Sequence, residues 1–172
     1  MFFCASMMCG NYDNLKDEIL ALDRAGVEMF HIDLMDGNLV PNYAMGRQDI
    51  HTIRKHTDKL IDVHLMVSSP KNYLPILVEE KVDIVYIHPE SDNRIIESFA
   101  YLRNQGIAPG IAVSPHVSYL CVQEILPYVE YVLLMTVVPG FAGQAFLQQT
   151  LSKIDQFIEN KPKHAYQLIL DG

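Results

Sequence analysis

Histidine and aspartate residues interrupt several otherwise apolar runs of this sequence. His31 and Asp33 lie in the segment HIDLMDG, His64 lies in DVHLMV, and Asp171 ends the run YQLILD. Burying such groups without partners is costly, so their repetition calls for a compensating partner. Two imidazoles and two carboxylates together are a suitable ligand set for a divalent ion of the borderline class, namely zinc, iron, manganese or cobalt.

Taken singly, the same residues have ordinary structural explanations. An H-x-D pair in a strand also fits a hydrogen-bonded structural pair, and His64 also fits a satisfied core histidine. Methionines at these positions also fit core packing. His51 and His56 fall in a charged segment typical of a solvated helix, and His88 either touches the site or shapes a loop.

Seven short apolar runs alternate with amphipathic segments along the chain. The expected strands span residues 2–8, 29–35, 60–67, 83–88, 107–113, 131–137 and 166–171. The expected helices span residues 14–26, 49–59, 70–81, 91–106, 117–128 and 144–161. Strands that are apolar almost throughout, each followed by a helix, indicate a parallel sheet. This α/β pattern favours a (β/α)8 barrel, the TIM barrel, over an open sheet.

The sequence ends at the seventh expected strand. We interpret residues 1–172 as a single barrel domain, since no linker or low-complexity tract interrupts them. A complete eight-unit barrel usually needs about 200–250 residues. We therefore expect the C-terminal units to be missing from this chain.

The polar residues cluster near the C-terminal ends of the expected strands. Residues two apart in a strand share a face, which groups His31 with Asp33 and Met35, and His64 with Met66. Further residues with the same placement are Ser6, Met135 and Asp171. Because active sites of parallel barrels are built at this rim, we predict a metal site at the barrel mouth.

The segment MTVVPGFAGQAF (135–146) also suggests chemistry. Its glycines allow close approach of the backbone to an anion, and a helix expected directly after Gly143 would offer free N–H groups. These features fit a phosphate cradle, and they fit an ordinary strand-to-helix turn equally well.

Composition limits the partners. Apolar residues make up 49% and charged residues 20%, and the net charge is −8, which disfavours nucleic acid and anionic membranes. Three cysteines without CxxC spacing fit a reducing cytoplasm. The apolar opening MFFCASMM lacks a basic region and is too short to span a membrane, so we interpret it as a strand.

The chain resembles the ribulose-phosphate 3-epimerase family over its whole length. The matching motifs are HIDLMDGNLVPN, DVHLMV, HPE, MTVVPGFAGQAF and the terminal DG. The FAGQ form of the loop, with Ala142, looks closer to the allulose-6-phosphate 3-epimerase branch. Two positions depart from the family pattern: Val138 stands where asparagine is common, and Ser114–Pro115 where Asn–Pro is common.

The resemblance implies roles for individual residues. His31, Asp33, His64 and Asp171 would bind one divalent metal ion, magnesium being a further possibility, and Asp33 and Asp171 would double as catalytic acid and base. The substrate, a phosphorylated ketose, would contact Ser6, His64, Met35, Met66, Met135, Gly140, Phe141, Ala142 and Gly143.

The resemblance also implies an isomerase that epimerises a ketose phosphate at C3 through an enediolate. The substrate pair would be ribulose and xylulose 5-phosphates, or allulose and fructose 6-phosphates. The family tends to form homo-oligomers. Two alternatives are a non-catalytic metal- or sugar-phosphate-binding relative and another phosphate-binding barrel, such as a lyase of the orotidine-phosphate decarboxylase and hexulose-phosphate synthase group. That group carries a D-x-K-x-x-D signature, whereas HLMVSSP contains no lysine.

Overall fold

A curved parallel sheet forms the centre of the molecule. The computed structural model describes residues 3–161 and 165–172, and its strands follow the order β1-β2-β4-β5-β6-β7-β8. Neighbours along this path pair in parallel, and the short strand β3 pairs antiparallel with β2. The strands are β1 (Cys4–Ser6), β2 (Met29–Asp36), β3 (Tyr43–Ala44), β4 (Leu60–Met66), β5 (Ile84–Ile87), β6 (Ala108–Val113), β7 (Tyr131–Met135) and β8 (Gln167–Asp171).

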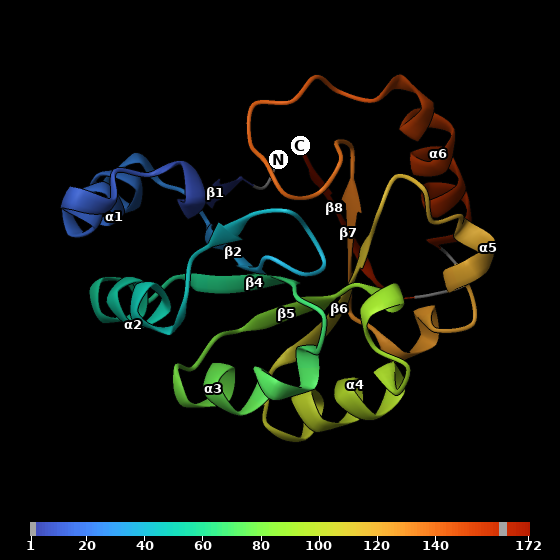
Figure 1. The fold of residues 1–172 in the computed structure, drawn as a ribbon, viewed down its shortest axis with the longest axis horizontal. Coiled ribbons are helices and arrows are strands. Elements are labelled where there is room, and N and C mark those ends of the chain that lie inside the picture. Colours follow the sequence, from blue (N-terminus) through green and yellow to red (C-terminus); the bar gives the residue numbers. More distant parts are fainter. Residues whose placement is uncertain (1–2, 162–164) are drawn as a thin grey trace.

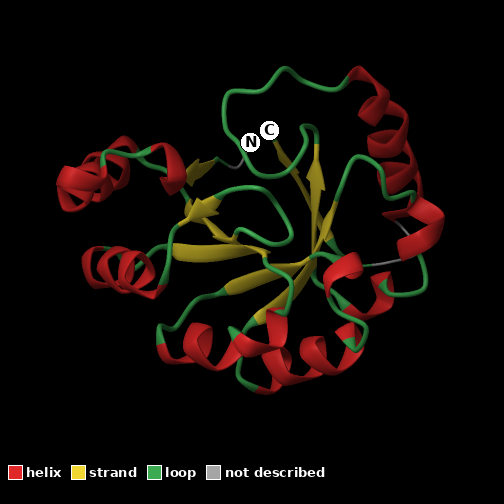
Figure 2. Ribbon diagram, in the orientation of Figure 1, coloured by secondary structure: helices red, strands yellow, loops and turns green. Residues whose placement is uncertain are grey.

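Helices cover the outer side of this sheet, as the ribbons in Figures 1 and 2 show. They are α1 (Leu15–Ala25), α2 (Arg47–His56), α3 (Leu74–Glu79), α4 (Ile95–Asn104), α5 (Tyr119–Val122) and α6 (Leu151–Asn160). The parallel strands alternating with helices confirm the predicted α/β barrel class, here in the form of a half-barrel. Within the described residues, the end strands β1 and β8 each pair with one neighbour.

Several elements differ from the sequence expectation. The strand expected over 2–8, whose first residue lies outside the described part of the chain, spans only Cys4–Ser6, because a 3-10 turn follows it at Met7–Cys9. The helix expected over 117–128 is reduced to α5 and a 3-10 turn at Leu126–Tyr128. The helix expected over 144–161 begins only at Leu151, after a 3-10 turn at Gln148–Thr150. The two-residue strand β3 was not expected, because a pair of residues is too short to show a strand pattern. No helix in the described ranges is long and apolar enough to cross a membrane.

Alternation along each strand separates two layers of side chains. On β2, Phe30, Ile32 and Leu34 join the large core between sheet and helices. Met29 instead packs in the barrel interior, and Met35 packs near its mouth. The intervening His31 and Asp33 therefore face the interior as well.

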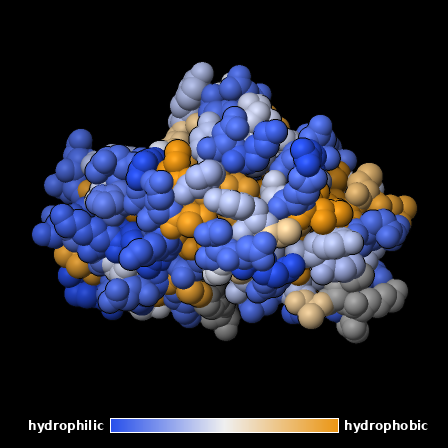
Figure 3. All heavy atoms as spheres, turned by 90° about the horizontal axis from the view of Figure 1, so that it is seen from below, coloured by the Kyte–Doolittle hydropathy of each residue, from blue (hydrophilic) through white to orange (hydrophobic). Residues whose placement is uncertain are grey.

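The outer surface of the helix layer is largely polar. Figure 3 views the molecule from the side of α3 and α4, where hydrophilic side chains cover much of the surface and apolar ones appear in patches. Each helix turns apolar residues inward: α2 buries Ile50 and Ile53, and α4 buries Phe99 and Leu102. The helices thus support the strands that carry the polar interior residues.

The loop that follows β2 is tied to the end of β4 by one carboxylate. Asp36 accepts hydrogen bonds from the backbone N–H groups of Asn38 and Leu39, and from the N–H and hydroxyl of Ser68. Burial alone would raise the pKa of Asp36. The hydrogen bonds from Ser68 and Asn38 outweigh it and lower the pKa to about 2.

We expect Asp36→Asn to destabilise the protein at neutral pH, with a difference that disappears in acid. Because the folded-state pKa lies below the unfolded value of about 3.9, the ionised carboxylate stabilises the fold above that value. This contribution is lost as the pH falls through about 2. Urea unfolding of both proteins from pH 7 downward measures it, and a difference that stays constant with pH would contradict the assignment.

Candidate metal centre and cavity

Strand register places two histidine–aspartate pairs side by side on the inner face of the sheet. Along the paired strands β2 and β4, His31 lies opposite Asp62, and Asp33 lies opposite His64. All four side chains are buried. The sequence places them there through simple alternation, because positions 31 and 33, and positions 62 and 64, are two apart.

Asp171 approaches these pairs from β8, at the other end of the sheet. Asp33 Oδ1 lies 3.3 Å from both His31 Nε2 and His64 Nδ1. Asp171 Oδ2 lies 3.9 Å from His31 Nε2 and 3.7 Å from His64 Nδ1. One ligand atom from each of His31, Asp33, His64 and Asp171 lies within 4.8 Å of all the others. The four residues predicted from the sequence therefore converge.

This arrangement fits a divalent metal ion. Ligands bound tetrahedrally at about 2.0–2.2 Å lie about 3.3–3.6 Å apart, and the histidine–carboxylate separations here run from 3.3 to 3.9 Å. His31 Nε2 is buried and has no hydrogen-bond partner in the part of the chain that the structure describes. A buried ring nitrogen without a hydrogen bond, facing the carboxylates of Asp33 and Asp171, is suited to metal binding. The cluster thus has the composition and spacing of a divalent metal site.

The carboxylate of Asp62 orients His31. Asp62 accepts from His31 Nδ1 at 3.0 and 3.1 Å, which turns Nε2 toward Asp33. Burial lowers the pKa of His31, but the carboxylates of Asp62 and Asp33 outweigh it and raise the pKa well above its usual value. Burial likewise opposes ionisation of Asp33, and His31 and His64 reverse this, so the pKa of Asp33 falls. The cluster is therefore built to hold positive charge between carboxylates.

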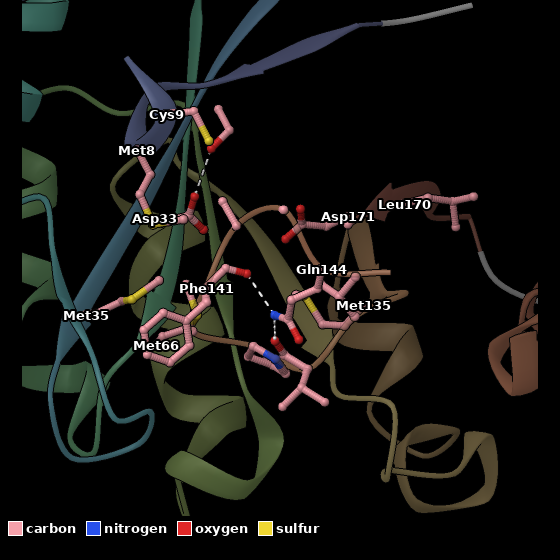
Figure 4. Close-up of a pocket in the computed structure, with 18 of the residues that line it drawn as sticks. Met8, Cys9, Asp33, Met35, Met66, Met135, Phe141, Gln144, Leu170 and Asp171 are labelled. Atoms are coloured by element: carbon pink, nitrogen blue, oxygen red, sulfur yellow. Dashed lines mark hydrogen bonds between the residues drawn. The ribbon is translucent and has the colours of Figure 1, made fainter. Parts of the chain in front are cut away.

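A cavity of about 330 Å³ opens beside the cluster. Its lining includes every residue predicted to contact the substrate except the fully buried His64: Ser6, Met35, Met66, Met135, Gly140, Phe141, Ala142 and Gly143. Figure 4 shows Asp33 and Asp171 reaching this cavity from different strands, with the labelled methionines nearby. Ser6 Oγ donates to Asp33 Oδ2 at 3.1 Å, which fixes the outer oxygen of that carboxylate.

The loop after β7 differs from the predicted strand-to-helix turn. Gln144 Nε2 donates to the carbonyls of Val138 and Phe141, as the dashed lines in Figure 4 show. Leu147 N–H then donates to the Thr136 carbonyl. These bonds hold a loop where the helix was expected, so the N-terminus of α6 does not follow Gly143 directly. The expected helix-terminus part of the phosphate cradle was wrong.

Glycine at two positions of this loop has a conformational reason. Gly140 and Gly143 have positive φ angles of 123° and 74°. A Cβ on Gly140 would also come within 3.2 Å of the Val40 Cβ. Asn42 Nδ2 donates to the Gly140 carbonyl at 2.7 Å, which ties the loop to the segment after β2.

Several contributing residues were missed from the sequence. Asp62 carries a detectable signal, because alternation puts it on the same face as His64. His88 fulfils both options left open for it: its Nε2 lies 2.8 Å from His64 Nε2, and its backbone carbonyl accepts from Ser91 in the loop that follows. Outside the site, His51 pairs with Glu80 and His56 Nδ1 contacts the Thr52 carbonyl.

Residues 3–172 match the ribulose-phosphate 3 epimerase family. The ribulose-phosphate 3-epimerase of Bacillus subtilis (strain 168) is 32% identical over 170 residues, covering 97% of this chain and 78% of the relative. That of Aquifex aeolicus (strain VF5) is 34% identical over 149 residues, covering 87% of this chain and 67% of the relative. The chain therefore belongs to the ribulose-phosphate 3-epimerase family, whose members are isomerases acting on carbohydrate phosphates.

Solved structures with little sequence similarity share the fold. Phosphoribosyl anthranilate isomerase from Thermotoga maritima aligns with a TM-score of 0.67 at 15% identity, covering all of this chain and 77% of its own. A mutant tryptophan synthase α-subunit from Pyrococcus furiosus aligns with a TM-score of 0.67 at 12% identity, covering 98% and 75%. At such low identity, these similarities concern the barrel fold alone.

We expect the chelator-treated protein to bind one equivalent of zinc or cobalt, and His31→Gln or His64→Gln to weaken that binding by more than about 100-fold. Removing a ligand should cost more than removing its outer partner, which costs about 10–100-fold. Competition with a chromophoric chelator measures the affinity. His51→Gln, at the surface, is the control, and unchanged affinity in both ligand variants would contradict the site.

Proposed function

We propose that this protein is a metal-dependent 3-epimerase of a ketose phosphate. The observation that carries this proposal is the meeting of His31, Asp33, His64 and Asp171 within 4.8 Å of one another, beside a cavity that two of them line. Family membership supports the same reaction class. The proposal covers the ligand set, the two bases and the substrate.

Epimerisation at C3 requires removal of a proton next to a carbonyl and delivery of a proton to the opposite face. Two groups are needed, one on each side of a flat enediolate. Asp33 and Asp171 reach the cavity from β2 and β8, which lie toward opposite ends of the sheet. We assign these two carboxylates as the acid–base pair, with each acting as base for one epimer and as acid for the other.

The surrounding residues would support this proton transfer. A divalent ion held by the four side chains would draw charge from the substrate oxygens as the proton leaves, which is worth several kcal/mol. Ser6 donates to Asp33 Oδ2, and the other oxygen of Asp33, Oδ1, faces His31 and His64. Met35, Met66 and Met135 line the cavity with apolar side chains that offer no competing acid or base.

The substrate we favour is ribulose 5-phosphate, with xylulose 5-phosphate as the product. The curated relatives support this choice through their name, ribulose-phosphate 3-epimerase. The alternative pair, allulose and fructose 6-phosphates, depends on Ala142 alone. The phosphate would lie along Gly140–Gly143, where the positive φ angles of both glycines give the backbone an unusual course.

The cavity lining separates this function from one of the two alternatives. Among the described residues that line the cavity there is no lysine, which disfavours a lyase of the decarboxylase type. A non-catalytic metal-binding relative would use the same two carboxylates as ligands, so only the proton-exchange assay below separates it from the epimerase. Homo-oligomeric assembly and a cytoplasmic location stay predictions from the resemblance and the cysteines.

We expect Asp33→Asn and Asp171→Asn each to slow epimerisation of ribulose 5-phosphate by about 10²–10⁴-fold, the usual contribution of general acid–base catalysis. Exchange of the C3 proton with solvent deuterium, followed by NMR, measures the step directly. The assay is run in parallel with allulose 6-phosphate to rank the two substrates.

Asp58→Asn, at an exposed position, serves as the matched control and should keep normal exchange. Near-normal turnover in either Asp33→Asn or Asp171→Asn would show that the two-base assignment is wrong. A wild-type protein that binds metal but exchanges no proton with either substrate would instead favour the non-catalytic relative.

A further inference from the structure

His64 has its two ring nitrogens in different surroundings. Nδ1 faces the cluster, 3.3 Å from Asp33 and 3.7 Å from Asp171. Nε2 points away from it and lies 2.8 Å from Nε2 of His88, which is also buried. The ring centroids lie 4.9 Å apart and the ring planes are inclined by 29°. At this distance one nitrogen donates and the other accepts, so only one of the two carries the hydrogen.

The groups around Nδ1 of His88 determine which of the two Nε2 atoms carries the hydrogen. His88 Nδ1 lies 3.1 Å from Ser114 Oγ and 3.3 Å from Glu90 Oε1. Ser114 Oγ in turn donates to Glu90 Oε1 at 2.7 Å, so its hydroxyl hydrogen is already used. The Glu90 carboxylate, and the Ser114 oxygen whose hydrogen points to Glu90, can only accept a hydrogen bond from His88 Nδ1. Nδ1 of His88 must therefore be the protonated nitrogen.

Glu90 is able to stay ionised in this role. Burial raises its pKa, but hydrogen bonds from His88 and Ser114 outweigh that effect and lower the pKa to about 2. Its side chain keeps 29% exposure and lies 3.9 Å from His116 at the surface. The carboxylate is therefore a fixed acceptor at neutral pH.

We propose that Glu90 and His88 are positioning residues that fix the tautomer of His64. Glu90, with Ser114, holds the hydrogen of His88 on Nδ1, which leaves the lone pair of His88 Nε2 to accept from His64 Nε2–H. When a metal ion occupies the cluster, His64 therefore binds it through the Nδ1 lone pair, while Nε2–H stays with His88. This inference rests on the metal site of the proposed function.

His31, the other imidazole of the cluster, is oriented in the same way, but the carboxylate contacts it directly. Asp62 accepts directly from His31 Nδ1, so Nε2 is the nitrogen that faces Asp33 and is available to a metal ion. Each histidine is thus oriented by a buried or half-buried carboxylate, directly for His31 and through a second imidazole for His64. Outer carboxylates of this kind commonly raise metal affinity.

The test compares two substitutions at His88. Leucine cannot accept a hydrogen bond, whereas the amide oxygen of glutamine can accept from His64 Nε2–H. We expect His88→Leu to weaken zinc binding by about 10–100-fold, the usual cost of losing an outer partner, and His88→Gln to recover most of it. Glu90→Gln should weaken binding by up to about tenfold, and Glu124→Gln, at an exposed position, should not change it. Chelator competition gives the affinities, and circular dichroism checks that each variant folds.

A second readout does not depend on any variant folding. In zinc-loaded wild-type protein, ¹⁵N NMR should show His64 protonated on Nε2 and His88 protonated on Nδ1. Zinc on Nε2 of His64, or the opposite tautomer of His88, would overturn the proposal that Glu90 and His88 fix the tautomer of His64. So would equal affinities for His88→Leu, Glu90→Gln and wild type, or a His88→Gln no better than His88→Leu. A wild-type protein that binds no metal would instead overturn the metal site itself.

Discussion

The register between β2 and β4 is the constraint on which the rest of the site depends. It sets His31 opposite Asp62 and Asp33 opposite His64, all on the inner face. Because the side-chain period of a strand is two, a slip of either strand by one residue would turn its two polar side chains toward the helices and break both pairs. The apolar residues between them, Ile32 and Val63, join the core under the helices and so oppose any slip.

Burial of so many ionisable groups is sustained by mutual pairing. His31 contacts two carboxylates, and His64 contacts Asp33 and His88. Burying one such group without a partner is strongly unfavourable, but a buried set is tolerated when each group keeps a partner. Within the described residues, His31 Nε2 lies 3.3 Å from Asp33 Oδ1 but makes no hydrogen bond, and a metal ion would complete the network at that nitrogen.

The sequence predicts the strands and the faces of their side chains better than the hydrogen-bond network of the site. Alternation in the segments 29–35 and 60–67 was enough to orient His31, Asp33 and His64, and the curved parallel sheet confirmed it. The same alternation would have found Asp62. No local pattern reveals that His88 meets His64, because that contact joins the ends of two strands 24 residues apart. The late start of α6 was likewise hidden, since side-chain bonds from Gln144 decide it.

The central claim is that four side chains from three strands share one cation. Anomalous diffraction at the zinc absorption edge, from crystals of the zinc-loaded protein, measures the position of the ion without reference to activity. The account predicts a single strong peak bound by His31 Nε2, His64 Nδ1 and the carboxylates of Asp33 and Asp171. A peak elsewhere, or none at this position in a protein that has taken up zinc, would contradict it.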